Sequence, residues 1–304
     1  MRIREIQGEE LNHVWPALAH LAGEEGAAGR LVRIHEMLSA GSPYCLLAED
    51  DGAAAGLAVV ENYRSAWIFV DYVATIREFL ATEDARGELL AAIETRGRAD
   101  GVNNLSRFTT AADPLLPWWE EAGFVEFMAA FRRPLDVEEL EVPQAAPDDG
   151  IVIREVTDLD ADWPKLRVLL EKLNQHHASI AERVLSPDRE ANTQKELAQE
   201  LERGEALVML AEDHGEAIAT SSAELGERHA DGSRTGFRSK LYVDEAYRGR
   251  GLPARFEARA LPWLRQHGVT DVERWIVAGN ERPRQIWTRR GYRPERLLLR
   301  KALG

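Results

Sequence analysis

The chain has 304 residues, a length that favours two domains at about 150 residues each. Its 52 Asp and Glu outnumber 38 Lys and Arg, and the net charge of -14 excludes a general binder of nucleic-acid backbones, which needs a basic surface. Cys45 is the only cysteine, so an intramolecular disulfide and a zinc site built on several thiolates are also excluded. No apolar run approaches the roughly 18 residues of a membrane span. We therefore expect a cytoplasmic protein without membrane, nucleic-acid or metal partners.

Five short segments occur twice in the same order. They are IRE (3–5 and 153–155), Trp-Pro (15–16 and 163–164), AED-x-G (48–52 and 211–215), Gly-Val (101–102 and 268–269) and Gly before an aromatic residue (123–124 and 291–292). The largest increase in the spacing between partners, from 148 to 163, lies between Trp163 and Ala211, so we expect a longer helical segment early in the second copy. Such repeats indicate two copies of one unit. We predict domains at 1–135 and 150–304, joined at 136–149 by an acidic linker with two prolines.

The second copy shows alternating strand and helix patterns along the chain. Alternation in IVIREV predicts a strand, helical spacing of leucines predicts the following helix, and DHGE predicts a hairpin turn. The predicted strands cover 151–156, 206–212, 217–225, 237–243, 272–278 and 296–303, the last of which closes the sheet. Four helices are predicted. The first begins at 159, the second covers 188–203, the third ends near Gly268 as a glycine C-cap requires, and the fourth covers 282–290.

The segment from Leu241 to Leu261 carries most information about function. A strand leads into a Gly-rich turn and then a helix, an arrangement that presents free backbone N–H groups and the positive end of the helix to an anion. Gly249 and Gly251 let a phosphate approach without meeting a Cβ, and the two neighbouring arginines add positive charge. The turn predicts a diphosphate site. The alternative is an ordinary solvated loop, because short Gly motifs often occur without a ligand.

Two motifs in this half of the chain resemble signatures of the GNAT acyltransferase family. RGRGLP (248–253) is similar to the family's R/Q-x-x-G-x-G/A motif and follows a strand that ends in LYVD, and VAGNERPRQIWTRRGY (277–292) is similar to the second signature. The resemblance covers 151–304 and extends more weakly, through the repeat, over 1–135. It implies an α/β (α+β) fold of two tandem GNAT-like domains, each with a mixed, mostly antiparallel sheet flanked by helices.

The same resemblance implies acetyl-CoA as co-substrate, in a split between the fourth and fifth strands. The implied binding residues are Leu241, Tyr242, Val243, Arg248, Gly249, Arg250, Gly251, Leu252, Pro253, Ala254, Asn280 and Trp287. The turn would hold the diphosphate, and the backbone of Leu241 to Val243 would pair with pantetheine and polarise the thioester carbonyl. Asn280 matches the family's asparagine that contacts the cofactor.

Two positions depart from the family pattern, and the catalytic base has only candidates. Pro253 stands where Gly or Ala is usual; it fits a first helical turn but lacks an N–H. Trp287 stands where many members have a tyrosine that protonates the leaving thiolate, and an indole is a donor only, so we expect it to form a wall of the site. Glu224 is our candidate for the catalytic base, followed by Glu227 and His229, although each alone is more often a solvated side chain.

The first copy lacks the expected ligand chemistry. At the spacing of the later repeats, the RGRG turn (Arg248–Gly251) aligns with Ala81–Asp84, which ends in two carboxylates, and Asn280 aligns with Ala112. These carboxylates would repel a diphosphate. We expect this copy to be a degenerate domain that serves as scaffold and as one wall of the acceptor site.

His176 and His177 lie in the region where GNAT proteins commonly contact the acceptor. Adjacent residues of a helix point in different directions, so we expect at most one of them to face a pocket, and a solvated helix end is the alternative.

The predicted function is an acyl-CoA-dependent N-acyltransferase that moves acetyl from acetyl-CoA to a primary amine of a small molecule or peptide by direct attack. The alternative is a non-catalytic acyl-CoA-binding or interaction protein, which Trp287, Pro253 and the degenerate first copy favour. The residues do not specify the acceptor, and a homodimer is compatible with them.

Overall fold

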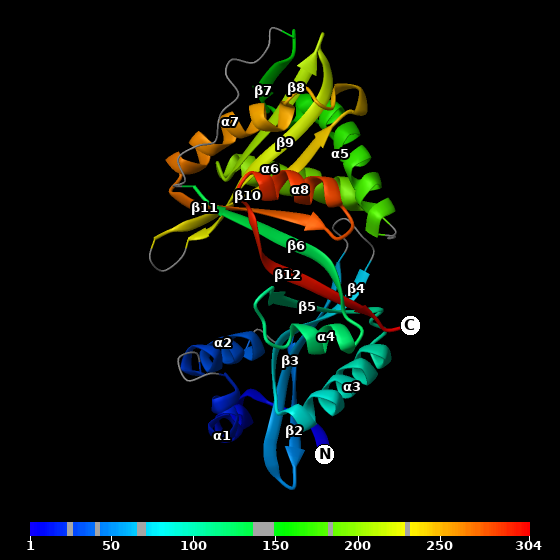
Figure 1. Cartoon of the computed structure of the whole chain (residues 1–304), viewed down its shortest axis with the longest axis vertical. Helices are drawn as coiled ribbons and strands as arrows, with labels where there is room; N and C mark the ends of the chain where they lie inside the picture. Colours follow the sequence, from blue (N-terminus) through cyan, green and yellow to red (C-terminus); the bar gives the residue numbers. More distant parts are fainter. Residues whose placement is uncertain (23–26, 40–42, 66–70, 136–148, 182–184, 229–231) are drawn as a thin grey trace. The chain divides into compact units, whose positions relative to one another are not determined.

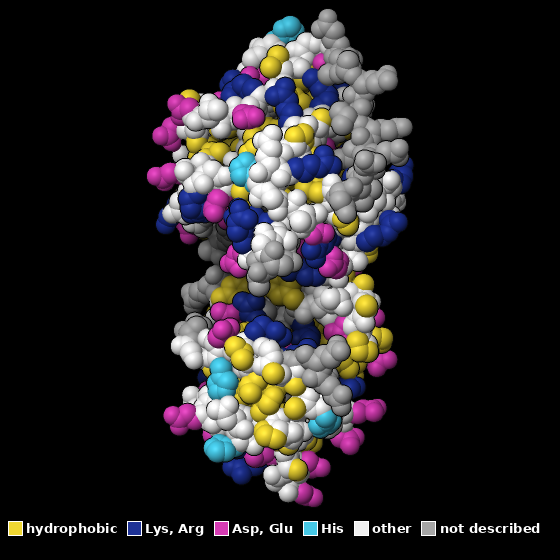
Figure 2. All heavy atoms as spheres, turned by 90° about the vertical axis from the view of Figure 1, so that its left-hand side faces the viewer, with side chains coloured by type: hydrophobic (Ala, Val, Ile, Leu, Met, Phe, Trp, Pro, Cys, Tyr) yellow, Lys and Arg dark blue, Asp and Glu magenta, His cyan; other side chains and the backbone are white. Residues whose placement is uncertain are grey.

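The computed structural model describes residues 1–22, 27–39, 43–65, 71–135, 149–181, 185–228 and 232–304 (Figure 1). The chain forms two compact units: unit 1 contains Met1–Ser65, Asp71–Glu126 and Leu298–Gly304, and unit 2 contains Phe127–Leu297. Within the described residues, no helix is both long and apolar enough to cross a bilayer. Basic and acidic side chains are mixed on the face shown in Figure 2.

Unit 1 contains a sheet and helices on both of its faces. Its elements are β1 (Arg2–Ile6), α1 (Gly8–Leu18), the 3-10 helix η1 (Ala19–Ala22), α2 (Ala27–Ser39), β2 (Pro43–Asp50), β3 (Ala53–Ser65), β4 (Asp71–Ala81), α3 (Glu83–Ala99), β5 (Asn104–Thr110) and α4 (Leu116–Glu121). The strand order is β1-β2-β3-β4-β5, and only β4 and β5 run parallel. Apolar residues of α1 and α2 form one core with β2 and β3, which is centred on Leu11, Leu47 and Leu57.

Unit 2 repeats this architecture. Its elements are β6 (Val125–Pro134), β7 (Val152–Glu155), α5 (Leu159–Ala181), α6 (Arg189–Glu202), β8 (Ala206–Asp213), β9 (Glu216–Arg228), β10 (Arg234–Val243), the 3-10 helix η2 (Glu245–Tyr247), α7 (Leu252–Gln266), β11 (Val269–Val277) and α8 (Glu281–Arg289). The last strand, β12 (Arg293–Ala302), begins in unit 2, and its residues from Leu298 belong to unit 1. The strand order is β6-β11-β10-β9-β8-β7, and only β10 and β11 run parallel. The expected α/β (α+β) class, with two tandem units of mixed, mostly antiparallel sheet and flanking helices, is confirmed.

Both faces of the unit 2 sheet are buried. Val208 and Leu210 of β8 pack with Leu166 and Leu170 of α5 in one core. Their neighbours on β8, such as Met209, point to the opposite face because side chains alternate along a strand, and they are also fully buried. Helix α7 packs on β8, β9 and β11. The long α5 is the extra helical length that the repeat spacing predicted.

The repeated sequence segments form the same contacts in both units. Arg4 of the first IRE segment binds Glu49 of the first AED segment, with 3.2 Å between Nε and Oε2. Arg154 of the second IRE segment binds Glu212 of the second, with 2.9 Å between Nη2 and Oε1, and also Asp162. These pairs join β1 to β2 and β7 to β8, the first two strands of each sequence copy, so the repeat identified in the sequence is a structural repeat.

The two strands at the ends of the copies are exchanged between the units. We expected 296–303 to close the sheet of the second copy, and this expectation is wrong: Leu298–Gly304 belongs to unit 1, where the N–H of Leu303 donates to the carbonyl of Asn103. In unit 2, β6 of the first copy pairs with β11, from Asp271 opposite Pro134 to Val277 opposite Met128. An apolar strand pattern sets which side chains are buried but not which sheet the strand joins. The domain limits at 135 and 150 stay a prediction, and 136–148 lies outside the described residues.

Candidate active site

Strands β10 and β11 pair only near their beginnings. The parallel register runs from Arg234 opposite Val269 to Phe237 opposite Glu273. Beyond these residues β10 stays paired with β9, and β11 stays paired with β6. The strands therefore separate toward their carboxyl ends, which is the split between the fourth and fifth strands of the second copy that we expected.

A bulge lies in β10 at the start of this split. Lys240 has a φ of 51°, a conformation that is uncommon for a residue with a side chain and is accepted only where the surroundings require it. The register with β9 shifts between Ser239 and Tyr242 at the same place. A bulge leaves an extra residue unpaired and redirects the strand. The backbone that we expect to meet pantetheine thus lies just after this irregularity.

A cavity of about 220 Å³ opens between the separated strands; we call it the β10–β11 cavity. Six of the predicted binding residues line it: Leu241, Tyr242, Val243, Arg248, Asn280 and Trp287. Leu173, His176, His177, Arg238, Ser239, Lys240, Arg274, Trp275, Ile276, Val277 and Pro283 complete the wall. The remaining predicted binding residues, from Gly249 to Ala254, form the turn and first helical residues that follow Arg248.

The RGRG turn has the backbone of an anion site. Gly249 and Gly251 have φ of 85° and 72°, in the left-handed region that only glycine adopts readily. A Cβ built at either position would meet no atom within 4 Å, so the space above the turn is open. No described backbone carbonyl accepts from the N–H groups of residues 249 to 251. Pro253 lies in the first turn of α7, where its missing N–H breaks no helical bond.

The two arginines of this turn are held loosely. The Nη1 of Arg248 lies 3.0 Å from Oε1 of Glu245 in an exposed ion pair, and its Nε donates to the carbonyl of Val243 at 3.3 Å. The guanidinium of Arg250 lies over the ring of Tyr247, 4.9 Å from its centroid. Exposed ion pairs contribute little, with a median of about 0 to 1 kcal/mol. Either arginine can therefore leave its present partner for an anion at low cost.

Glu224 lies in a polar cluster on β9 and β10 and does not line the β10–β11 cavity. Its Oε1 is 2.5 Å from Nζ of Lys240 and accepts hydrogen bonds from the hydroxyls of Ser222 and Ser239 at 2.7 and 2.6 Å. Burial raises the pKa of Glu224, but the lysine and the hydroxyls outweigh it and hold the pKa below its ordinary value. The carboxylate is therefore ionised and well solvated by protein groups, which makes it a weak proton acceptor. Its role as base stays a prediction.

The structure adds Glu200 of α6 to this cluster, a residue that the sequence did not single out. Burial, together with the negative charge of Glu224, raises the pKa of Glu200 to about 7. Its Oε2 is buried without a hydrogen-bond partner among the described residues. Helical spacing in α6 could not identify it, because the groups that perturb it come from β9 and β10. Of the other candidates for the base, His229 lies outside the described residues.

His176 and His177 both line the β10–β11 cavity, with ring centroids 6.1 Å apart. The expectation that at most one would face a pocket is wrong, because the cavity extends along more than one face of the end of α5. Burial and the neighbouring imidazole lower the pKa of His177 to about 4. This ring is neutral near pH 7, so it can donate one hydrogen bond and accept another but adds no charge.

Trp287 forms part of the wall, as the sequence led us to expect. Its ring is 4% exposed and lies under the guanidinium of Arg274, 3.5 Å from the ring centroid, with Tyr292 edge-on at 5.5 Å. Such cation–π packing is strongest when water is excluded. Trp287 therefore fixes Arg274 at the cavity.

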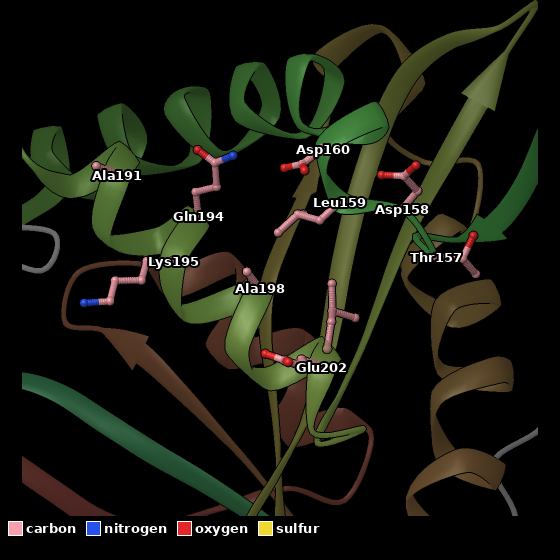
Figure 3. A pocket seen from close by; sticks show the side chains of 10 residues that line it. Thr157, Asp158, Leu159, Asp160, Ala191, Gln194, Lys195, Ala198 and Glu202 are labelled. Atoms are coloured by element: carbon pink, nitrogen blue, oxygen red, sulfur yellow. The ribbon is translucent and has the colours of Figure 1, made fainter.

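A second hollow lies between the beginning of α5 and α6 (Figure 3). Its wall contains the carboxylates of Asp158, Asp160 and Glu202 and the amine of Lys195. Asp158 accepts from the N–H of Ala161 and so caps α5. This hollow shares no lining residue with the β10–β11 cavity, and we assign it no part in the site.

The turn is absent from unit 1. There β4 ends at Ala81 and α3 begins at Glu83, so Thr82 alone separates strand from helix. Our alignment of the RGRG turn with Ala81–Asp84 is wrong in detail, because the loop between strand and helix is missing and has not merely changed its residues. Glu83 and Asp84 occupy the first turn of α3, where carboxylates favour the positive helix end.

Residues 170–292 match the model of the Acetyltransferase (GNAT) family. A GCN5-related N-acetyltransferase from Sphaerobacter thermophilus has a similar structure, with 20% identity and a TM-score of 0.58 over 99% of this chain and 95% of that one. A tandem GNAT protein from the clavulanic acid biosynthesis pathway gives 16% identity and a TM-score of 0.56 over 100% of this chain and 98% of that one. No curated protein sequence is significantly similar to the chain.

Similarity at these identities demonstrates the fold, and in both structures it extends over the two units. The family match covers the separated strands, the RGRG turn and Trp287 of unit 2. Together they show that residues 170–292 form a domain of the Acetyltransferase (GNAT) family, and that the fold of the two solved structures extends over both units.

Proposed function

We propose that the chain is an acyl-CoA-dependent N-acyltransferase that transfers an acyl group, with acetyl-CoA as the expected donor, to a primary amine of a small molecule or peptide. The observation that carries this proposal is the β10–β11 cavity, which reaches Arg248 at the start of the RGRG turn. An anion site beside a narrow cavity suits a ligand with a diphosphate and an uncharged arm. The RGRG turn and Asn280 would hold the donor at its two sides.

The chemistry expected at this site is a direct transfer. The amine nitrogen attacks the thioester carbonyl carbon, the C–S bond breaks, and CoA leaves as a thiolate while the amine loses a proton. Backbone N–H groups after the bulge, from Leu241 to Val243, would stabilise the carbonyl oxygen as it gains negative charge. A thiol near the pKa of cysteine, about 8.5, leaves with little help. Trp287 can then occupy the position of the family's acid without supplying a proton.

The proton of the amine needs an acceptor, and we propose Glu224 through the hydroxyl of Ser239. Ser239 lines the cavity, and its Oγ donates to Oε1 of Glu224 at 2.6 Å. The hydroxyl would accept the amine proton while its own proton passes to Glu224. The ion pair with Lys240 opposes this step by lowering the pKa of the carboxylate. Glu224→Gln and Ser239→Ala should therefore reduce kcat by similar factors if the relay operates.

The second candidate is a non-catalytic acyl-CoA-binding or interaction protein. The observation that favours it is the burial of Trp287 under Arg274, which leaves a non-acidic group at the position of the family's acid. Binding of CoA is common to both candidates and does not separate them.

Release of free CoA thiol from acetyl-CoA, measured with a panel of primary amines, tests the proposal. We expect amine-dependent release by the wild-type chain, no acyl-enzyme in a burst phase, and loss of release in Arg250→Glu. Tight binding of acetyl-CoA without release for any amine of the panel would favour the second candidate. Absence of CoA binding would contradict both.

A further inference from the structure

Arg238 is a buried cation with most of its hydrogen bonds unmade. The residue is 4% exposed and lines the β10–β11 cavity. Its Nη2 donates to the hydroxyl of Ser221 at 2.9 Å, whereas Nε and Nη1 are buried and have no partner among the described residues. A guanidinium carries five N–H donors, and a buried charge without a partner is costly. The folded chain tolerates this cost at the wall of a cavity.

Arg274 lies at the same cavity from the neighbouring strand. It is also 4% exposed; its Nη2 donates to Oε1 of Glu257 at 2.8 Å, and its Nε has no partner among the described residues. Glu257 also binds Arg290 and accepts from the hydroxyl of Tyr292 at 3.4 Å. One buried carboxylate therefore serves two arginines, and Arg238 adds a third positive charge without a carboxylate in contact.

The corresponding positions in unit 1 show which of these two arginines both units share and which one occurs in unit 2 alone. Arg107 of β5 corresponds to Arg274 and also lies over a tryptophan, 4.9 Å from the centroid of Trp119. In the β4–β5 register, Ile76 stands opposite Arg107. Ile76 lies five residues before the end of β4, and Arg238 lies five residues before the end of β10, so Ile76 corresponds to Arg238. The fold thus accepts an apolar residue at this position, and the second arginine is a feature of unit 2 alone.

We propose that Arg238 and Arg274 form a carboxylate site at the β10–β11 cavity, so that one of the two substrates carries a carboxylate near its reacting group. The inference rests on the proposed acyl-CoA-dependent function and adds a substrate class to it. Guanidinium groups bind carboxylates in charge-assisted, often bidentate pairs. The lowered pKa of Arg238, about 9, which burial and Arg274 cause, agrees with a site that lacks its anion. A diphosphate is not the anion expected here, because the RGRG turn provides a separate site for it.

The carboxylate can belong to the acyl group of the donor or to the acceptor, and matched pairs of probes distinguish these sources. For the donor, calorimetry compares succinyl-CoA with butyryl-CoA, which have equal numbers of acyl carbons. For the acceptor, thiol release from acetyl-CoA compares β-alanine with propylamine. We expect the carboxylate form to be favoured about tenfold or more in one of these pairs, as for a charge-assisted pair.

Arg238→Met is the decisive variant, with Arg238→Lys as the conservative control. The methionine variant should lose the carboxylate preference and keep its affinity for free CoA, while the lysine variant should keep part of the preference. Removing an unpaired buried charge should also raise the melting temperature of the ligand-free chain, whereas a purely structural arginine would lower it on removal. Equal behaviour of both probes in both pairs, or a preference that survives Arg238→Met, would overturn the inference. Failure of free CoA to bind the wild type would instead contradict the proposed function.

Discussion

The two units differ most at the segment that joins the parallel strand to the following helix. In unit 2, Asp244 to Gly251 stand between β10 and α7, and this segment contains two glycines with positive φ and two arginines. In unit 1, Thr82 alone joins β4 to α3, and two acidic residues follow it. Strand, helix and their packing are kept in both units, so the missing loop changes the ligand chemistry and leaves the fold intact.

Other contacts are the same in the two units. The hairpin turns at Asp51-Gly52 and His214-Gly215 have positive φ at both residues, as type I′ turns require. The arginine that packs on a tryptophan also occurs in both, as Arg107 on Trp119 and Arg274 on Trp287. These shared contacts maintain the fold, and the residues that differ between the units carry the proposed function.

The sharpest test of this difference is the number of CoA sites. We expect one acyl-CoA per chain by calorimetry, and we expect Arg250→Glu to weaken CoA binding by about tenfold to a hundredfold, because a charge-assisted bond contributes roughly 1.5 to 3 kcal/mol. Arg77→Glu in β4, whose guanidinium binds Glu61, is the matched control and should change the affinity little. Two tight sites per chain, or equal losses in both variants, would remove the distinction between the units.

The shared arginine–carboxylate contacts should differ in strength between the units. In unit 2, both carboxylates that bind Arg154 are mostly buried, with Asp162 12% and Glu212 14% exposed, whereas in unit 1 Glu49 is 18% exposed and the second partner of Arg4, Glu10, is 45% exposed. Arg154→Met should therefore lower the free energy of unfolding by about 1 to 2 kcal/mol at pH 7 after allowance for solvent screening. The loss should be smaller for Arg4→Met. Denaturant unfolding of each variant is the measurement, and a larger loss for Arg4→Met would contradict it.

The contribution of Arg154 should also depend on pH. Its hydrogen bonds lower the pKa of Glu212 to about 2. A carboxyl whose pKa is lower in the folded state stabilises the fold above its unfolded pKa, and this stability is lost as the pH falls toward the folded value. The difference between wild type and Arg154→Met should thus shrink between pH 5 and pH 2.5. A difference that stays constant over this range would show that the arginine acts through packing.

Glu200 offers a test of the polar cluster in unit 2. Its pKa of about 7 lies above the ordinary value, so its ionisation destabilises the fold as the pH rises through 7. Glu200→Gln should stabilise the chain by about 1 kcal/mol or more at pH 8 and change little at pH 5. Melting curves at the two pH values are sufficient, and stabilisation of equal size at both would exclude ionisation as the cause.

The smallest effect on rate is expected at the shared tryptophan. Trp287→Phe should reduce kcat by less than about tenfold, because the indole is a donor only and supplies no proton. Trp119→Phe in unit 1 should lower stability about as much as Trp287→Phe does, and it should leave CoA affinity unchanged. A loss of several orders of magnitude in Trp287→Phe, with CoA affinity unchanged, would show a chemical role for the indole.

Much of the fold can be predicted from local sequence. The alternation in IVIREV, the leucine spacing of α5 and the glycine after α7 each depend on neighbouring residues, and the corresponding elements end within a few residues of their expected limits. The repeated IRE and AED segments correctly predicted two similar units. The RGRG turn is also local, since the positive φ of its glycines and the helix that follows are encoded within one short segment.

The tertiary structure decided which distant groups meet. The exchange of β6 and the end of β12 between units could not be read from strand patterns, because either strand satisfies the same alternation. Lys240 meets Glu224 at the bulge in β10, and Arg238 and Arg274 line one cavity where β10 separates from β11. The charge and burial of each side chain at such a site depend on residues from several strands and helices. A sequence therefore determines the elements and the anion-binding turn, whereas the chemistry of the cavity wall depends on contacts between residues far apart in the chain.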